Sequence, residues 1–177
     1  MMRETIAGIW ADDWVRATHL DGLDIAGLAR HVLDGINQFS RLAAGDGFDA
    51  DVRVEVDAID VALRFDEIAG ESVARWGAAD ALTATYSMPW GQEHGERLAA
   101  YLIVETIGHA WDLATALGRE LAISDDLADT VLEVAQSFSE ETLRAPGMFG
   151  AQQSAPADAK PIVRLVSFLG RTATAGG

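Results

Sequence analysis

Apolar residues recur every three or four positions along most of this 177-residue chain, and that spacing restricts the fold more than any other feature of the sequence. One such stripe runs through Ile25, Leu28, Val32, Ile36 and Phe39, and it predicts a helix with one buried face. The same periodicity predicts further helices at 2–15, 57–77, 93–117, 124–144 and 161–169. The sequence therefore predicts an all-α fold, namely a four-helix bundle with short accessory helices.

Capping and turn-forming residues set the expected ends of these helices. Asp21 or Asp24 can cap the helix that carries the first stripe, and a Gly-Asp-Gly turn ends it after Ala44. In the helix expected at 57–77, the residues available to the core include Leu63 and Val73.

Three segments do not have a helical pattern. Residues 51–56 alternate polar and apolar side chains and predict a short extended piece, and residues 83–91 predict a loop or a short strand. Prolines and glycines predict a long C-terminal loop at 146–161. The length fits a single domain, which we expect at 1–171, followed by a disordered tail at 172–177.

The charge excludes several classes of partner. With 13 basic and 28 acidic residues the formal net charge is −15, which disfavours nucleic acid and anionic membranes because both carry phosphate. No apolar window is long enough for a membrane span, and the first fourteen residues do not resemble a signal peptide. The chain contains no cysteine, which excludes disulfides and thiolate metal ligands and is consistent with a cytoplasmic location.

The segment expected to form the longest helix carries polar side chains on its apolar face. Glu105, His109 and Asp112 are three or four residues apart, so they are neighbours on one side of the helix. They share that stripe with Leu98, Tyr101, Leu102, Leu113 and Ala116. A buried carboxylate costs several kcal/mol unless a cation or a donor meets it, and no Lys or Arg lies on this stripe. A metal ion would supply the missing positive charge.

The helix that begins near residue 25 has a matching polar residue on its apolar stripe. His31 lies between Leu28 and Val32, and antiparallel packing would place it opposite Glu105 and His109. Two imidazoles and one carboxylate form a three-ligand set with open coordination positions, which is typical of catalytic zinc, nickel, iron or cobalt. A hydrogen-bonded polar core without metal fits the same spacing, and the spacing does not choose between them.

The remaining candidates are weaker. We expect His19 and His94 to be solvated surface histidines, because one lies in a predicted loop and the other in the first turn of a helix. Trp90, in the predicted loop at 83–91, is a candidate for the mouth of a pocket.

Three segments carry a resemblance to a known family. They are Ala-Arg-His-Val at 29–32, Glu-Thr-Ile-Gly-His-Ala-Trp-Asp-Leu-Ala at 105–114, and the stretch from Phe-Gly at 149–150 to Leu-Gly-Arg at 169–171. They resemble the DinB/YfiT-like superfamily, and within it the actinobacterial branch that includes the N-terminal domain of mycothiol-dependent maleylpyruvate isomerases. The resemblance runs from about Trp14 to Arg171 and implies a four-helix bundle with a metal site in its pocket.

The resemblance also assigns roles to individual residues. It implies that His31, Glu105 and His109 are the metal ligands, and that Asp112 is the acid that orients His109 or the pocket. Two features depart from the family pattern. The segment before Trp14 is shorter than a full first helix, which favours a homodimer or a widened pocket, and the thiol-binding C-terminal domain of the isomerases is not evident.

These observations lead to three functional hypotheses. The first is a metal-dependent enzyme for a small molecule, of the thiol-dependent S-transferase or isomerase class, using a diffusible thiol such as mycothiol. The second is a metal-free acid/base isomerase, cyclase or lyase that uses the same residues. The third is a non-catalytic ligand-binding bundle.

Overall fold

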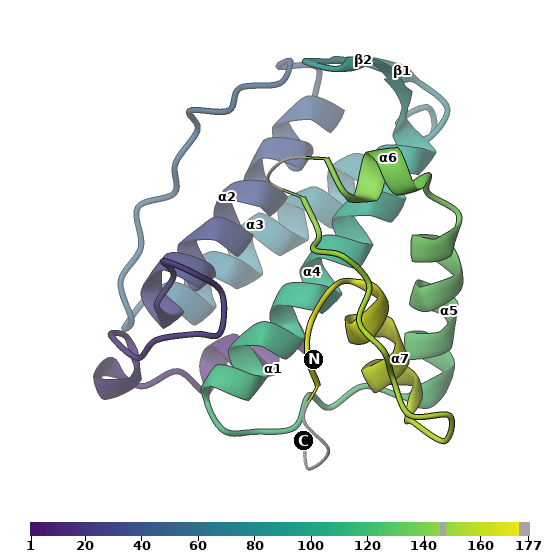
Figure 1. Ribbon diagram of the computed structural model, residues 1–177. Helices are drawn as coiled ribbons and strands as arrows, with labels where there is room; N and C mark the ends of the chain where they lie inside the picture. Colours follow the sequence, from purple (N-terminus) through teal and green to yellow (C-terminus); the bar gives the residue numbers. More distant parts are fainter. Residues whose placement is uncertain (146–147, 174–177) are drawn as a thin grey trace. The chain divides into compact units, whose positions relative to one another are not determined.

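The computed structural model describes residues 1–145 and 148–173 and shows a mainly helical chain (Figure 1). Its elements are α1 (Met2–Ala7), a 3₁₀ turn η1 (Ala11–Asp13), α2 (Ile25–Ala43), α3 (Val61–Trp76), β1 (Thr85–Met88), β2 (Gly91–His94), α4 (Gly95–Ala116), α5 (Asp125–Gln136), α6 (Glu140–Leu143) and α7 (Pro161–Phe168). The predicted helical class is confirmed in this coarser form. The β1–β2 hairpin makes the stricter prediction of an all-α chain inexact.

The chain forms two compact units, Met1–Gly118 and Arg119–Gly177, and each is described by itself. In the first unit α2 packs along both α3 and α4, and α1 contacts the same two helices. In the second unit α5 packs against α7. The single domain expected at 1–171 stays a prediction, and most of the tail expected at 172–177 lies outside the described residues.

Helix α2 forms as its sequence predicts. The carboxylate of Asp24 accepts the backbone N–H of Gly27 at 2.7 Å, which caps the first turn. The five stripe residues, Ile25, Leu28, Val32, Ile36 and Phe39, are all buried. Gly45, with φ at +93°, follows the C-cap Ala44 and reverses the chain there.

Two helices are shorter at one end than periodicity indicates. The first ends at Ala7, not near Val15, because Gly8 follows it and the Asp13 carboxylate accepts the N–H of Trp10 to start a separate turn. Helix α3 begins at Val61, four residues later than predicted. The carboxylate of Asp57 accepts the N–H groups of Ile59 and Asp60, which forms a turn in place of helix.

The prediction that Leu63 and Val73 lie in the core is wrong. Their exposed fractions are 62% and 75%, whereas Phe65 and Ile68 on the same helix are buried. Apolar residues occur on more than one face of α3, and periodicity does not reveal which of these faces packs against α2.

A hairpin precedes the longest helix. Strands β1 and β2 pair antiparallel with Thr85 opposite His94, so the strand alternative for this segment is correct. Helix α4 begins at Gly95, where a Cβ atom would collide with the carbonyl oxygen of Ala81. A glycine is therefore required at this junction. The segment at 51–56 forms no strand, although the N–H of Val54 donates to Asp34 at 2.6 Å.

In the second unit, the single helix predicted at 124–144 is divided. Helix α5 ends at Gln136, and Ser139 caps the separate α6 by accepting the N–H of Thr142. Residues 148–160 form neither helix nor strand, in line with the predicted loop, while Pro146 and Gly147 lie outside the described residues. Within the described ranges, no helix is long and apolar enough to cross a membrane.

Candidate metal centre

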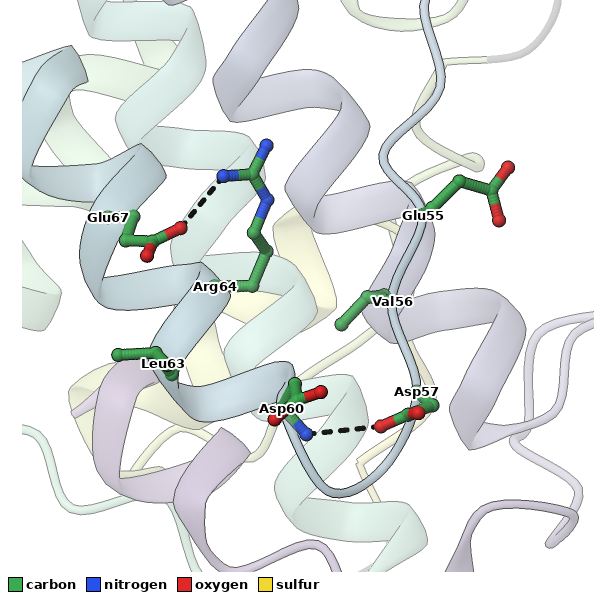
Figure 2. Close-up of a pocket in the computed structure, with 7 residues that line it drawn as sticks. All are labelled: Glu55, Val56, Asp57, Asp60, Leu63, Arg64 and Glu67. Atoms are coloured by element: carbon green, nitrogen blue, oxygen red, sulfur yellow. Dashed lines mark hydrogen bonds and ion pairs between the residues drawn. The ribbon is translucent and has the colours of Figure 1, made fainter.

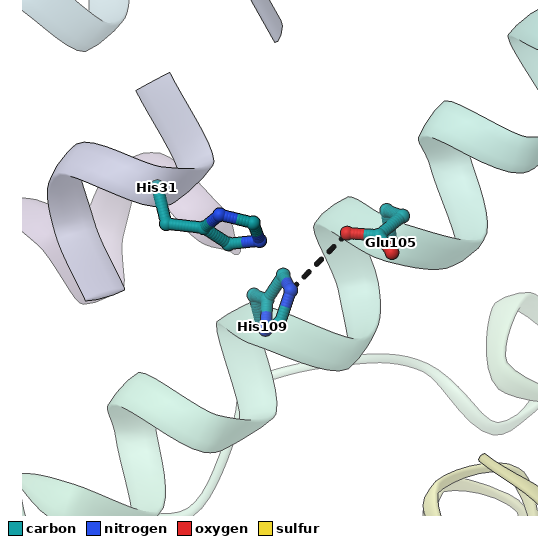
Figure 3. Close-up of side chains that lie close together, drawn as sticks. All are labelled: His31, Glu105 and His109. Carbon is teal, nitrogen blue, oxygen red and sulfur yellow. Dashed lines mark ion pairs between the residues drawn. The ribbon is translucent and has the colours of Figure 1, made fainter. Parts of the chain in front are cut away.

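Three side chains from two helices converge in the first unit. His31 projects from α2 toward Glu105 and His109 of α4 (Figure 3). Each residue offers one ligand atom, and these atoms lie within 4.8 Å of one another. The rings of His31 and His109 meet edge to face, with centroids 4.9 Å apart and planes at 85°. Among the described residues, this is the group of histidines and acids that could hold a metal ion.

The local sequence explains how α4 presents its two residues. Glu105 and His109 are four residues apart on one face, and Glu105 Oε2 lies 3.1 Å from His109 Nε2. Val104 and Leu113 are fully buried and fix the rotation of α4, so the polar pair is directed toward α2.

The buried carboxylate of Asp112 holds the other nitrogen of His109. Asp112 is fully buried, and its Oδ2 lies 2.9 Å from His109 Nδ1. This contact leaves Nε2 of His109 directed to the face that Glu105 and His31 share. It is the contact that an orienting role for Asp112 requires.

Two further residues belong to this network. The hydroxyl of Tyr101 donates to Oε1 of Glu105 at 2.7 Å. His19 is exposed, as predicted, but its Nε2 also lies 3.0 Å from Oδ1 of the buried Asp112, a contact that the prediction did not include. The sequence carries no periodic signal for this contact, because His19 lies in an irregular connection between η1 and α2. His94 is exposed, as predicted.

The pKa values of the α4 pair move in opposite directions. Burial alone would raise the pKa of Glu105, but the hydrogen bonds and charge of His109, with the Tyr101 hydrogen bond, lower it to about 2. Burial alone would lower the pKa of His109, but hydrogen bonds and charges of Asp112 and Glu105 raise it to about 9. Burial of its ring, together with the charge of His109, lowers the pKa of His31.

The protonation states of the α4 residues suit a divalent cation. At neutral pH the Glu105 carboxylate and the His109 imidazolium form an ion pair. A divalent cation that takes the place of the His109 Nε2 proton would meet a carboxylate and a neutral imidazole, and both are ligands of such ions.

Comparisons with known proteins do not assign a function. Two uncharacterised proteins of Mycobacterium tuberculosis, from strains CDC 1551 / Oshkosh and H37Rv, are each 29% identical to this chain over 170 residues. The alignments cover 94% of this chain and 90% of each relative. No protein-family model matches the chain, and no solved structure gives a significant match. The grouped side chains of His31, Glu105 and His109 are therefore what indicates a function for this chain.

A separate hollow of about 510 Å³ lies beside the start of α3 (Figure 2). Its lining includes Glu55, Val56, Asp57, Asp60, Leu63, Arg64 and Glu67. Arg64 and Glu67 neutralise each other at 2.8 Å, and no lining residue belongs to the His31 group. Trp90, the predicted pocket-mouth residue, does not line this hollow; it is 59% exposed and packs against Phe48.

Proposed function

We propose that His31, Glu105 and His109 bind a divalent metal ion, and that the protein is a metal-dependent enzyme of the DinB/YfiT-like superfamily acting on a small molecule. The observation that carries this proposal is the convergence of two imidazoles and one carboxylate within 4.8 Å. Such a set suits zinc, nickel or iron.

The distances fit a shared ion. Two ligands of one tetrahedral zinc ion, each at about 2.05 Å, stand about 3.3 Å apart. The Glu105 and His109 ligand atoms are 3.1 Å apart, close to this separation, and the ligand atom of His31 lies within 4.8 Å of both. The contact between Asp112 and His109 Nδ1 matches the carboxylate–histidine–metal arrangement common to such centres.

The chemistry follows from the open positions of a three-ligand site. A bound divalent ion lowers the pKa of a coordinated water or thiol and so supplies a nucleophile at neutral pH. Since the chain has no cysteine, any thiol must be a diffusible one, and the family resemblance favours mycothiol in an S-transferase or isomerase reaction. The relatives come from an actinobacterium, which is consistent with the branch that the sequence resembles.

The proposal includes the four-helix bundle of that superfamily, a homodimer and a cytoplasmic location. The bundle and the homodimer follow from the resemblance to that superfamily, and the cytoplasmic location is consistent with the lack of cysteine.

The metal content of the purified protein tests the proposal directly. We expect about one divalent ion per chain by elemental analysis after purification in metal-free buffers and reloading with zinc. The His109→Ala variant, once circular dichroism has shown that it is folded, should retain none, whereas His94→Ala, which alters an exposed histidine, should match the wild type. Absence of metal from the wild type after reloading would contradict the proposal.

Removal of the Tyr101 hydroxyl should weaken metal binding without abolishing it. Tyr101→Phe removes the hydroxyl that donates to Glu105 Oε1. The other carboxylate oxygen, Oε2, which faces His109, is then less well oriented for a metal ion. We expect a loss of affinity of about tenfold in a competitive zinc titration. Tyr86→Phe is a matched control, since its hydroxyl bonds to the carbonyl of Ala81. Equal affinities for Tyr101→Phe and the wild type would exclude this role for the hydroxyl.

One observation favours metal-free acid/base chemistry as a second candidate. His31 has a lowered pKa and is neutral at pH 7, while His109, with a pKa of about 9, keeps its proton. Neighbouring groups with pKa values driven apart form an acid and a base. A wild type that binds no metal, with turnover lost in His31→Ala, would favour this candidate.

A further inference from the structure

The carboxylate of Asp112 bridges two imidazoles. Its Oδ2 lies 2.9 Å from His109 Nδ1, and its Oδ1 lies 3.0 Å from His19 Nε2. Asp112 is fully buried, whereas the side chain of His19 is 35% exposed. The contact with His19 is therefore made at a buried atom and is not an ion pair between two solvated groups.

His19 completes a continuous series of polar contacts. From His19 the series passes through Asp112, His109 and Glu105 to the hydroxyl of Tyr101, and each contact uses a different atom. The last four residues all belong to α4. His19 is the member of this series that comes from another segment, the connection between η1 and α2.

The backbone around His19 is held in place. The Thr18 N–H donates to the carbonyl of Leu23 at 3.0 Å, and the Thr18 hydroxyl accepts the N–H of Leu20 at 3.1 Å. The imidazole of His19 also packs edge to face against Trp111, with ring centroids 5.4 Å apart. The Thr18 contacts hold the backbone next to His19, and Trp111 supports its ring, which is what a side chain that orients another one needs.

We propose that His19 is a positioning residue of the metal centre, which holds Oδ1 of Asp112 and thereby keeps Oδ2 on His109 and His109 Nε2 directed at His31 and Glu105. The contact of Oδ1 with His19 and the contact of Oδ2 with His109 together restrain rotation of this carboxylate about its Cβ–Cγ bond. This inference rests on the proposed metal site. Partners of metal-binding histidines contribute about 10–100-fold in affinity, and His19 acts one contact further away, so we expect about tenfold.

Cobalt binding tests the role of His19. His19→Ala should weaken Co²⁺ binding about tenfold and alter the visible absorption spectrum of the Co²⁺-loaded protein. His19→Gln should restore most of both properties, because its amide N–H can donate to Asp112. His94→Ala is the matched control and should behave as the wild type does. Wild-type affinity and spectrum in His19→Ala would overturn the proposal.

A second readout needs no metal. In the metal-free protein, the ¹⁵N chemical shift of His109 Nδ1 reports its contact with Asp112, and we expect it to change in His19→Ala and to recover in His19→Gln. An unchanged shift would overturn the role of His19. If the wild type binds no Co²⁺, the proposed metal site fails, whereas the nitrogen shift still decides whether His19 positions His109.

Discussion

Replacing His31 by alanine should lower the affinity for zinc by more than about 100-fold and leave the stability of the metal-free protein nearly unchanged. The reason is that His31 offers one of three ligand atoms, yet it is an exposed residue. Loss of a direct ligand must cost more than loss of a partner behind a ligand, which is worth about 10–100-fold. A competitive titration with a chromophoric chelator measures the affinity.

Because His31 is exposed, the effect of this variant on metal binding is easier to interpret than the effect of a change at His109. Alanine at 109 removes a ligand, but it also removes one imidazole partner of the buried Asp112 carboxylate. A loss of zinc affinity in that variant could therefore come from unfolding and not from the missing ligand. Urea unfolding of the metal-free His31→Ala protein serves as the check on folding, and His94→Ala serves as the control for loss of a histidine. Zinc affinity within threefold of the wild type would exclude His31 as a ligand.

The convergence of the candidate site could be predicted because it depends on regular helix geometry. Spacing of four residues places Glu105 and His109 on one face wherever α4 lies, and the stripe of α2 places His31 on the side of that helix that faces α4. Antiparallel packing of these two helices with a matching offset along their axes brings the three residues close. The convergence of His31 with Glu105 and His109 can therefore be inferred without knowing the tilt of α2 or its contacts with a third helix.

The contacts made by irregular segments could not be predicted in the same way. His19 reaches Asp112 across more than ninety positions of sequence, from a connection whose path is fixed by turns at Thr18 and Leu23. No periodicity describes such a path. The start of α3 was predicted too early for a related reason. The Asp57 side chain accepts a backbone N–H that a longer helix would use, and this hydrogen bond depends on the local conformation and not on hydropathy.

The prediction of which face of α3 is buried was wrong for a different reason. Leu63 and Val73 carry the same apolar character as buried residues of that helix, and they are exposed because α3 packs with another side toward α2 and α1. An apolar residue shows that burial would be favourable, but not that a partner is present.

Alanine in place of Asp112 should destabilise the metal-free protein by about 3 kcal/mol, the largest stability effect we expect from a single change in the network. Asp112 is fully buried and contacts both His19 and His109, so its removal leaves a cavity and a buried imidazolium that has lost a carboxylate. Asp112→Asn keeps the shape and one acceptor oxygen, so it should lose less.

Tryptophan fluorescence during urea unfolding measures this loss in the relevant part of the chain. All five tryptophans lie in the unit Met1–Gly118, which also contains Asp112, so the signal reports that unit alone. Asp46→Ala is the control, because it removes an exposed partner of Arg41 and should cost less than about 1 kcal/mol. A loss below about 1 kcal/mol for Asp112→Ala would mean that the bridge between the two imidazoles contributes little to folding. An orienting role at His109 would then explain the burial of Asp112 better than stability does, because the contact with His109 Nδ1 is present whether or not it stabilises the fold.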